Sequence, residues 1–163
     1  MARFVGEYRY AVDPKGRINL PAPFRKILAP GGKDTSFIVT RGFELCLVVY
    51  PMEIWEALEL ENAKLEWTDD DVRYYLRLLN SKASEQSFDK QGRIVLSKER
   101  RHWARIGKEV VIVGGGLTHL EIFSPEVYQT YLKGVFAYED DMDARYIEAA
   151  KRAHQTIRKL QID

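Results

Sequence analysis

Apolar and polar residues alternate along several short stretches of the chain, a pattern that predicts β-strands. Tyr8–Val12 alternates with aromatic residues on one face, and after a turn Arg17–Leu20 continues the alternation with Ile18 and Leu20 facing inward. A segment led by proline then predicts a short helix over 21–28, because proline suits the first turn of a helix. Further apolar stretches predict strands over 37–40 and 45–49.

The middle of the chain has helical rather than strand periodicity. One helix is predicted over 51–62, and a second helix follows with Thr68 as its expected N-cap. Three aspartates at 69–71 would lie in the first turn of this second helix, where the helix dipole favours negative charge. Its apolar residues recur at helical spacing and form one stripe, made of Val72, Tyr75, Leu76 and Leu79.

The strand and helix pattern of the first third returns further along the chain. Further strands are predicted at 85–88, 93–96, 110–113 and 117–123. Ser97 is the expected N-cap of a helix that ends at Ala104 and buries Trp103 and Ile106. Helices are also predicted from 124 onwards and over 142–160, and the last one would carry a stripe of Tyr146, Ala150, Ala153, Ile157 and Leu160.

One five-residue motif occurs twice within a longer internal repeat. Asp13–Arg17 reads Asp-Pro-Lys-Gly-Arg, and Asp89–Arg93, 76 residues later, reads Asp-Lys-Gln-Gly-Arg. A second set of matches lies 73 residues apart, so one loop is three residues shorter in the second copy, a change that loops tolerate at small cost. The chain is therefore predicted to be a tandem duplication whose halves pair about a pseudo-two-fold axis. The matched strand residues should be buried in equivalent positions, Ile18 with Ile94 and Leu20 with Leu96.

The formal net charge of +1 is the sum of regions with opposite signs. Residues 2–28 carry six cations and two anions, a net charge of +4, and residues 82–108 carry eight cations and three anions, a net charge of +5. Residues 44–71 carry one cation and nine anions, a net charge of −8. Since the positive charge belongs to the two copies of the motif and their surroundings, a polyanionic partner is expected there.

Composition narrows the class of protein further. A chain of 163 residues with 45% hydrophobic and 30% charged residues is typical of a soluble globular protein with one sizeable core or two small ones. No apolar run approaches the roughly 20 residues of a membrane helix, and the N-terminus lacks the apolar centre of a signal peptide. We therefore expect a cytoplasmic protein without a membrane partner. The single cysteine, Cys46, cannot form an internal disulfide and is expected to be buried.

No group of residues has the spacing of a catalytic or metal site. The histidines, His102, His119 and His154, lie far apart in the sequence, and no cysteine or acidic residue joins them at metal-ligand spacing. The glycines at 114–116 lie between two strand patterns and precede no Gly-Lys-Ser/Thr, which favours a hairpin turn over a phosphate-binding loop. We therefore expect no enzymatic activity, no cofactor, no metal and no small-molecule substrate.

The arginine that ends each motif is the strongest candidate for a binding residue. Arg17 and Arg93 precede inward-facing apolar residues, so both guanidinium groups should project from one outer surface, where each could donate to O6 and N7 of guanine. The alternative is that they only close their turns through exposed ion pairs, worth about 0–1 kcal/mol each. The other motif residues are interpreted as structural, namely Asp13, Gly16, Asp89 and Gly92. The cations expected to contact DNA phosphates are Lys15, Arg25, Arg100 and Arg101.

These residues resemble the signature of a known family. The stretches Phe4-x-Gly6-x-Tyr8, Asp13-x-Lys15-Gly16-Arg17 and Pro21-x-x-Phe24-Arg25 resemble the N-terminal signature of MraZ, a family of bacterial transcriptional regulators built from two SpoVT-AbrB-like repeats. Asp89-x-x-Gly92-Arg93 lies where the second repeat of that family would place it, and the resemblance covers the whole chain. The second copy departs from the pattern, because it lacks the Phe/Gly/Tyr lead-in and has Gln91 in place of lysine. The two halves are therefore expected to contribute unequally to binding.

The resemblance implies an α+β fold with a swapped-hairpin AbrB-like β-barrel, in which two tandem pseudo-symmetric repeats replace the two subunits of an AbrB dimer and helices flank the barrel. We expect repeats at 5–52 and 82–125, a helical connection at 53–81 and C-terminal helices at 126–163. The resemblance also implies binding of double-stranded DNA at short guanine-containing direct repeats, in the promoter of the family's own division and cell-wall gene cluster. A ring-like homo-oligomer associated with the nucleoid is implied as well.

Three functions remain open from the residues themselves. The first is a sequence-specific DNA-binding regulator. The second is a ring-forming interaction protein whose basic face docks an acidic protein, for which residues 44–71 of a neighbouring subunit are a candidate. The third is a small enzyme with a site that no motif reveals. A salt-titrated binding assay with promoter DNA and random DNA separates the first two, because phosphate contacts alone do not discriminate sequence.

Overall fold

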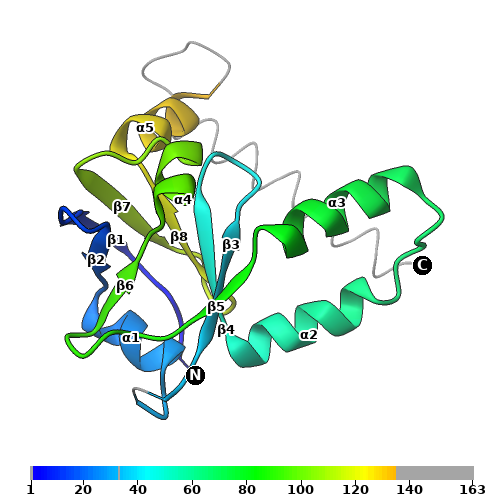
Figure 1. Cartoon of the computed structure of the whole chain (residues 1–163), viewed down its shortest axis with the longest axis horizontal. Helices are drawn as coiled ribbons and strands as arrows, with labels where there is room; N and C mark the ends of the chain where they lie inside the picture. Colours follow the sequence, from blue (N-terminus) through cyan, green and yellow to red (C-terminus); the bar gives the residue numbers. More distant parts are fainter. Residues whose placement is uncertain (1, 33, 135–163) are drawn as a thin grey trace. The chain divides into compact units, whose positions relative to one another are not determined.

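The computed structural model describes residues 2–32 and 34–134, and the chain up to Val127 forms one compact unit (Figure 1). Its strands are β1 (Glu7–Ala11), β2 (Arg17–Asn19), β3 (Phe37–Arg41), β4 (Leu47–Pro51), β5 (Ser84–Gln86), β6 (Arg93–Val95), β7 (Glu109–Gly114) and β8 (Leu120–Phe123). Its helices are α1 (Ala22–Leu28), α2 (Met52–Asn62), α3 (Asp70–Ser81), α4 (Lys98–Trp103) and α5 (Pro125–Lys133). The helix predicted over 142–160, with its apolar stripe, lies outside the described residues.

The strands form one six-stranded antiparallel sheet, in the order β1-β7-β8-β4-β3-β5, and a separate two-stranded ladder of β2 and β6. β1 of the first half pairs with β7 of the second half, and β5 of the second half pairs with β3 of the first. β4 also pairs with β8, and β2 with β6, so these ladders join the halves as well. Each half thus supplies its first strand to the hairpin of the other half. The predicted pairing of the halves is confirmed, and the fold is a mixed α+β structure.

The ladder of β2 and β6 packs against the sheet through its inward residues. Ile18 lies opposite Ile94 across the ladder, and their exposed fractions are 1% and 0%. Leu20 and Leu96 are buried in the same core, as the matched alternation of the two copies predicted. Burying one such side chain contributes roughly 1.5–3 kcal/mol, so this core holds the ladder in place.

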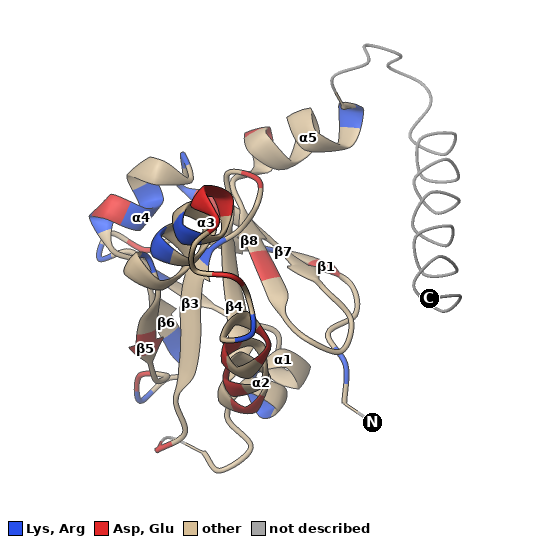
Figure 2. Cartoon of the chain, turned by 90° about the vertical axis from the view of Figure 1, so that its right-hand side faces the viewer, with Lys and Arg blue, Asp and Glu red and all other residues tan. Residues whose placement is uncertain are grey.

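The opposite face of the sheet is covered by α2 and α3, which extend from it in Figure 1. On β3, Phe37 and Val39 join the main core, while the intervening Ile38 packs with Trp55 of α2 and Leu79 of α3. Of the predicted stripe on α3, only its last residue is buried and the other three are half-buried. Figure 2 shows acidic residues gathered on α2 and basic residues on α4, as the charged regions of the sequence predict.

Helix caps agree with the sequence in one case and differ in the other. The hydroxyl of Ser97 accepts from the backbone N–H of Arg100 at 3.2 Å, so the predicted cap of α4 is confirmed. The predicted cap of α3 is wrong by one residue. Asp69, not Thr68, accepts from the first free backbone N–H groups of the helix, at 2.8 and 3.2 Å. A carboxylate at this position also interacts favourably with the positive end of the helix dipole.

Two further expectations are corrected by the tertiary structure. Trp103 was expected to be buried but is half-buried, because one side of its ring packs against the core while the guanidinium of Arg41 lies over the ring. The last strand begins at Leu120 rather than 117, since the hairpin turn extends to His119 and is closed by a bond from the Gly115 N–H to its carbonyl at 2.8 Å. None of the helices in the described part of the chain has the length and apolar character needed to span a membrane.

Candidate nucleic-acid interface

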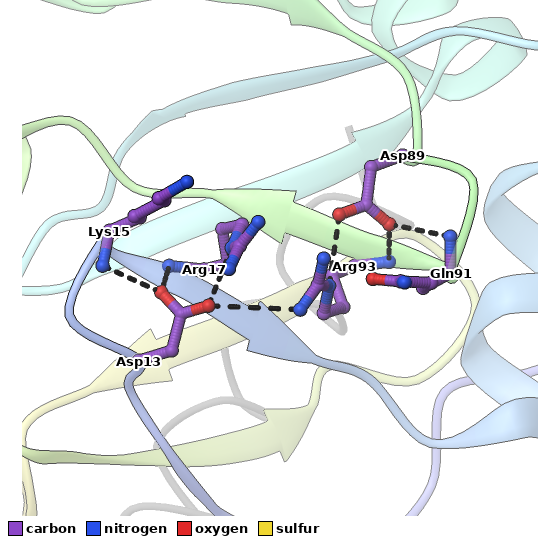
Figure 3. A network of polar contacts seen from close by, with 6 residues as sticks. All are labelled: Asp13, Lys15, Arg17, Asp89, Gln91 and Arg93. Carbon is purple, nitrogen blue, oxygen red and sulfur yellow. Dashed lines mark hydrogen bonds and ion pairs between the residues drawn. The ribbon is translucent and has the colours of Figure 1, made fainter.

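Each copy of the five-residue motif folds into the same hydrogen-bonded turn (Figure 3). In the first copy the N–H of Asp13 donates to the carbonyl of Arg17 at 3.0 Å, and the N–H of Gly16 donates to the carbonyl of Asp13 at 2.9 Å. The second copy repeats both bonds among its equivalent residues, at 2.9 and 3.0 Å. Gly16 has a φ of 79° and its equivalent, Gly92, a φ of 75°. This left-handed conformation favours glycine, which explains why both copies contain one.

The aspartate of each turn holds the arginine of the same turn. Oδ1 of Asp13 accepts from the backbone N–H groups of Lys15 and Arg17, at 2.9 and 2.8 Å, and Oδ2 accepts from Nε of Arg17 at 2.5 Å. Asp89 accepts the three equivalent hydrogen bonds, each at 2.9 Å. These bonds, above all the one from the backbone N–H of the arginine, lower the pKa of both carboxyl groups below the usual aspartate value.

The two motif arginines lie together on the outer face of the β2–β6 ladder. Because their neighbours Ile18 and Ile94 face the core, Arg17 and Arg93 face the other way, and their side chains are 29% and 22% exposed. Nη1 of Arg93 lies 3.7 Å from Oδ2 of Asp13, so the two motifs also contact each other (Figure 3). Nε of each arginine is bound to its own aspartate. The Nη atoms of Arg17 have no hydrogen bond or ion pair among residues 2–32 and 34–134.

Two of the cations expected at phosphates occupy equivalent positions in the two halves. Nη1 of Arg25 donates to the carbonyl of Leu20 at 3.0 Å, and Nε of Arg101 donates to the carbonyl of Leu96 at 3.0 Å. Each uses one nitrogen for this bond, and each side chain is half-buried. Lys15 is exposed on the first turn, while in the second copy Gln91 takes its place. The halves therefore differ in charge at this position.

The turn of each half lies against the arginine of the other half. A Cβ placed on Gly16 would lie 2.9 Å from Nε of Arg101, and one placed on Gly92 would lie 3.2 Å from Cδ of Arg25. The N–H of Leu96 also donates to the carbonyl of Gly16, at 2.8 Å. Spacing along the chain could not reveal this cross-contact, because it depends on the exchange of strands between the halves. Arg17, Arg93, Arg25 and Arg101 thus belong to one connected group.

Arg100 lies elsewhere, although it is next to Arg101 in the same helix. Nη2 of Arg100 donates to the carbonyls of Val39 and Lys82, at 3.1 and 2.8 Å, which ties α4 to β3 and to the end of α3. Burial lowers the pKa of its guanidinium. The sequence gave no reason to separate the two neighbours, since both belong to one short basic run. These contacts favour a structural role for Arg100.

One group of potential metal ligands lies away from the ladder in the described part of the chain. Single ligand atoms of Glu44, Cys46 and Glu121 all lie within 4.8 Å of one another. The sequence predicted no metal site, and it could not reveal this group because the three residues come from both halves. Cys46 is fully buried, as predicted, and burial followed by the nearby carboxylates raises the pKa of its thiol. The thiol is therefore protonated and neutral at physiological pH.

The pairing of two identical turns on one ladder agrees with a family whose model contains a repeat. The model described as "MraZ protein, putative antitoxin-like" matches the chain twice, at residues 3–78 and 79–152. The chain belongs to the MraZ family. The resemblance inferred from the two motifs is thereby confirmed, and each match of the family model contains one Asp-x-x-Gly-Arg turn.

Curated relatives extend this similarity over most of the chain. A protein of Carboxydothermus hydrogenoformans named "Transcriptional regulator MraZ" is 39% identical over 145 residues, covering 89% of this chain and 97% of that protein. Proteins with the same name from Natranaerobius thermophilus and Heliobacterium modesticaldum are 42% and 41% identical, covering 78% and 84% of this chain. They are covered over 85% and 92% of their own lengths.

Proposed function

We propose that this protein is a DNA-binding regulator of transcription that acts by binding and not by catalysis. The single observation that supports the proposal best is the presentation of Arg17 and Arg93 on one outer face of the β2–β6 ladder, each held by an identical turn. The names of the curated relatives support the same function. A guanidinium that is held in place loses little conformational freedom when it binds, which favours specific contacts.

In this proposal the motif arginines read bases. The aspartates bind the arginines through Nε, which leaves the Nη edges to donate to O6 and N7 of guanine in the major groove. A good bidentate contact of this kind discriminates against other bases by about 1–3 kcal/mol. The operator would consist of short guanine-containing direct repeats in the promoter of the protein's own division and cell-wall gene cluster.

Three other cations would contact the DNA backbone. Lys15 is exposed on the first turn, and Arg25 and Arg101 lie in equivalent positions beside the two turns. Phosphate contacts set the position of the protein on the duplex without reading its sequence. We leave Arg100 out of this group because its guanidinium bonds to two backbone carbonyls. The absence of a lysine equivalent to Lys15 in the second motif predicts fewer phosphate contacts from that half.

The test compares variants by their ratio of affinity for operator DNA to affinity for random DNA. Arg17→Ala and Arg93→Ala should lower this ratio, each by roughly 5- to 150-fold if one bidentate guanine contact is lost. Lys15→Ala should weaken binding to both DNAs alike and reduce the salt slope by about 0.9. Arg77→Ala removes an equal charge from α3, outside the ladder, and is the matched control. If the ratio stays unchanged in both motif variants, the arginines only close their turns and the base-reading proposal is wrong.

We also propose that the exchange of β1 and β5 between the halves represents the swapped-hairpin barrel of the AbrB type, with repeats at 5–52 and 82–125. A helical connection at 53–81 and C-terminal helices at 126–163 complete the proposed organisation. The exchange supports this assignment, because an AbrB-type barrel requires strands of each half to complete the hairpin of the other. A cytoplasmic location associated with the nucleoid follows from the proposed function.

Self-association into a ring is the remaining part of the proposal. Several large apolar side chains of the described residues are exposed, including Phe43 at 90%, Leu60 at 70% and Tyr74 at 68%. A ring would present many weakly binding faces to repeated DNA sites, and linked sites gain from their effective concentration. Sedimentation at micromolar concentration should show an oligomer. A monomer that still binds the operator specifically would overturn the ring and leave the DNA-binding proposal standing.

A further inference from the structure

A cavity of about 440 Å³ lies where α4 meets the end of α3 and the hairpin of β3 and β4. Arg41 and Leu47 line it from the hairpin, Lys82 follows α3, and Arg100 and Trp103 come from α4. The cavity is separate from the outer face of the β2–β6 ladder, because neither motif arginine lines it. Its volume suits a small organic molecule.

The cavity has an excess of positive charge. Arg41, Lys82 and Arg100 face one carboxylate, that of Glu99, so the net charge is +2 with His102 neutral. Glu99 already forms an ion pair with Lys82 at 3.3 Å, and its side chain is 79% exposed. Among residues 2–32 and 34–134, neither arginine forms an ion pair within 4.0 Å. Two guanidinium groups at this cavity are therefore left without a direct anionic partner.

The hydrogen bonds of Arg100 position its charge without neutralising it. Its Nη2 donates to the carbonyls of Val39 and Lys82, both neutral acceptors. With its amide turned to satisfy both ends, Gln86 accepts from Nη1 at 3.0 Å, and this acceptor is neutral too. A half-buried cation whose acceptors are all neutral is electrostatically incomplete, because the charge is removed from water without a counter-ion.

The remaining wall of the cavity is apolar and partly aromatic. The guanidinium of Arg41 lies 4.8 Å from the centre of the Trp103 ring, so this cation sits at the boundary between the aromatic wall and the charged rim. Leu47 and Ala83 add aliphatic surface, and the hydroxyl groups of Ser81 and Ser97 are within the lining. A ligand matching this wall combines a compact anionic group with a small apolar or planar body.

We propose that this cavity binds a small organic phosphate, whose phosphate group lies between Arg41, Lys82 and Arg100 and whose body packs beside Trp103. Arginine forks match the oxygens of phosphate, and charge-assisted hydrogen bonds are the strong ones. The site goes beyond the proposed DNA contact and does not depend on it. It would make the protein responsive to a phosphorylated small molecule, since Arg100 in the cavity is followed in α4 by Arg101 beside the first motif turn.

The experiment is a calorimetric titration of the full-length chain with phenyl phosphate, with inorganic phosphate and phenol as probes of the two parts. Phenyl phosphate should bind saturably with one site per chain, and more tightly than either part alone. Arg41→Gln should weaken it at least about tenfold, because one charge-assisted contact is lost. Arg77→Gln is the matched control, since Arg77 also lies over an indole ring, that of Trp67, at 5.7 Å but outside the cavity. It should leave the affinity within twofold of the parent chain.

Lys82→Gln is the second variant, because its exposed ammonium can be removed with little risk to folding. It should also weaken phenyl phosphate binding, and operator affinity of Arg41→Gln should stay within twofold of the parent. The proposal is overturned if the folded parent shows no saturable binding, or if Arg41→Gln and Arg77→Gln bind the probe equally. It is also overturned if Arg41→Gln loses affinity for all DNA while the parent ignores phenyl phosphate, because the cavity would then hold a DNA phosphate. Failure of operator binding by the parent would instead count against the proposed function alone.

Discussion

At the scale of single residues, the two motif glycines share a backbone conformation but differ in their surroundings. Gly16 and Gly92 both have positive φ. A Cβ on Gly16 would meet the backbone carbonyl oxygen of Leu96 at 2.6 Å, whereas one on Gly92 would meet only the flexible side chain of Arg25, at 3.2 Å. Gly32, with a φ of 83°, has open space around it and isolates the cost of the backbone conformation.

We predict that Gly16→Ala is the most destabilising of these three substitutions. Gly32→Ala should cost about 1–2 kcal/mol, the price of placing a Cβ in the left-handed region, and Gly92→Ala should cost about the same. Gly16→Ala should cost roughly 1–3 kcal/mol more, because the backbone it meets must shift. Urea denaturation measures all three. Equal losses at positions 16 and 32 would show that the close approach to the other half is not a constraint.

The carboxyl groups of the motif turns also give a residue-scale prediction about pH. The pKa values of Asp13 and Asp89 are lowered from the usual 3.8, so in the folded state these groups bind fewer protons than in the unfolded chain. Their contribution to stability is therefore complete above the unfolded value and is lost as pH falls through the lowered folded values. The double variant Asp13→Asn/Asp89→Asn should flatten the loss of stability below about pH 4. An acid limb as steep as that of the parent would contradict this linkage.

At the scale of elements, the ends of α3 and α4 are set by single side chains. Asp69→Ala and Ser97→Ala should each destabilise the protein by about 0.5–2 kcal/mol, because each removes a cap that accepts backbone N–H groups. Thr68→Ala is the matched control for α3 and should change stability by less than about 0.5 kcal/mol. Thermal denaturation followed by circular dichroism measures the three changes. A larger loss at Thr68 than at Asp69 would mean that the helix begins one residue earlier than described.

The exchange of strands is the second feature of the element scale. A first strand that pairs within the other half cannot complete its own hairpin, so neither half has a closed sheet by itself. The ladder of β2 and β6 reinforces this dependence, because each of its two strands comes from a different half. The turn that positions each motif arginine therefore depends on residues of both halves.

At the scale of the whole molecule, this dependence predicts one cooperative unfolding transition for the paired halves. Ile18→Ala and Ile94→Ala should each destabilise by about 2–5 kcal/mol, because both side chains are buried in the shared core. The double variant should lose less or more than the sum by about 0.5–3 kcal/mol, since the residues are direct partners across the ladder. Denaturant titration followed by two probes, fluorescence and circular dichroism, measures the coupling. Additive losses, or two separate transitions, would show that the halves fold independently.

Much of the architecture could be predicted because its signals are local. Alternation along a strand specifies which side chains are apolar on one face, so the burial of Ile18 and Ile94 followed directly from the matched copies. The repeated Asp-x-x-Gly-Arg turn was recognisable because its hydrogen bonds join residues within five positions of each other. The duplication and the family membership were readable for the same reason, since both depend on residue identity in order along the chain.

The tertiary structure alone decided which segments meet. Nothing local distinguishes Arg100 from Arg101, yet one bonds to carbonyls of β3 and the end of α3 while the other lies against the turn of the first half. The cavity beside Trp103 and the cluster around Cys46 likewise combine residues that are far apart in the sequence. A short strand or helix specifies its own apolar face, but that face can be buried by any partner of suitable shape. The choice of partner is made by the free energy of the whole packed core, which is why the exchange of strands and the surroundings of each arginine became visible only in the folded molecule.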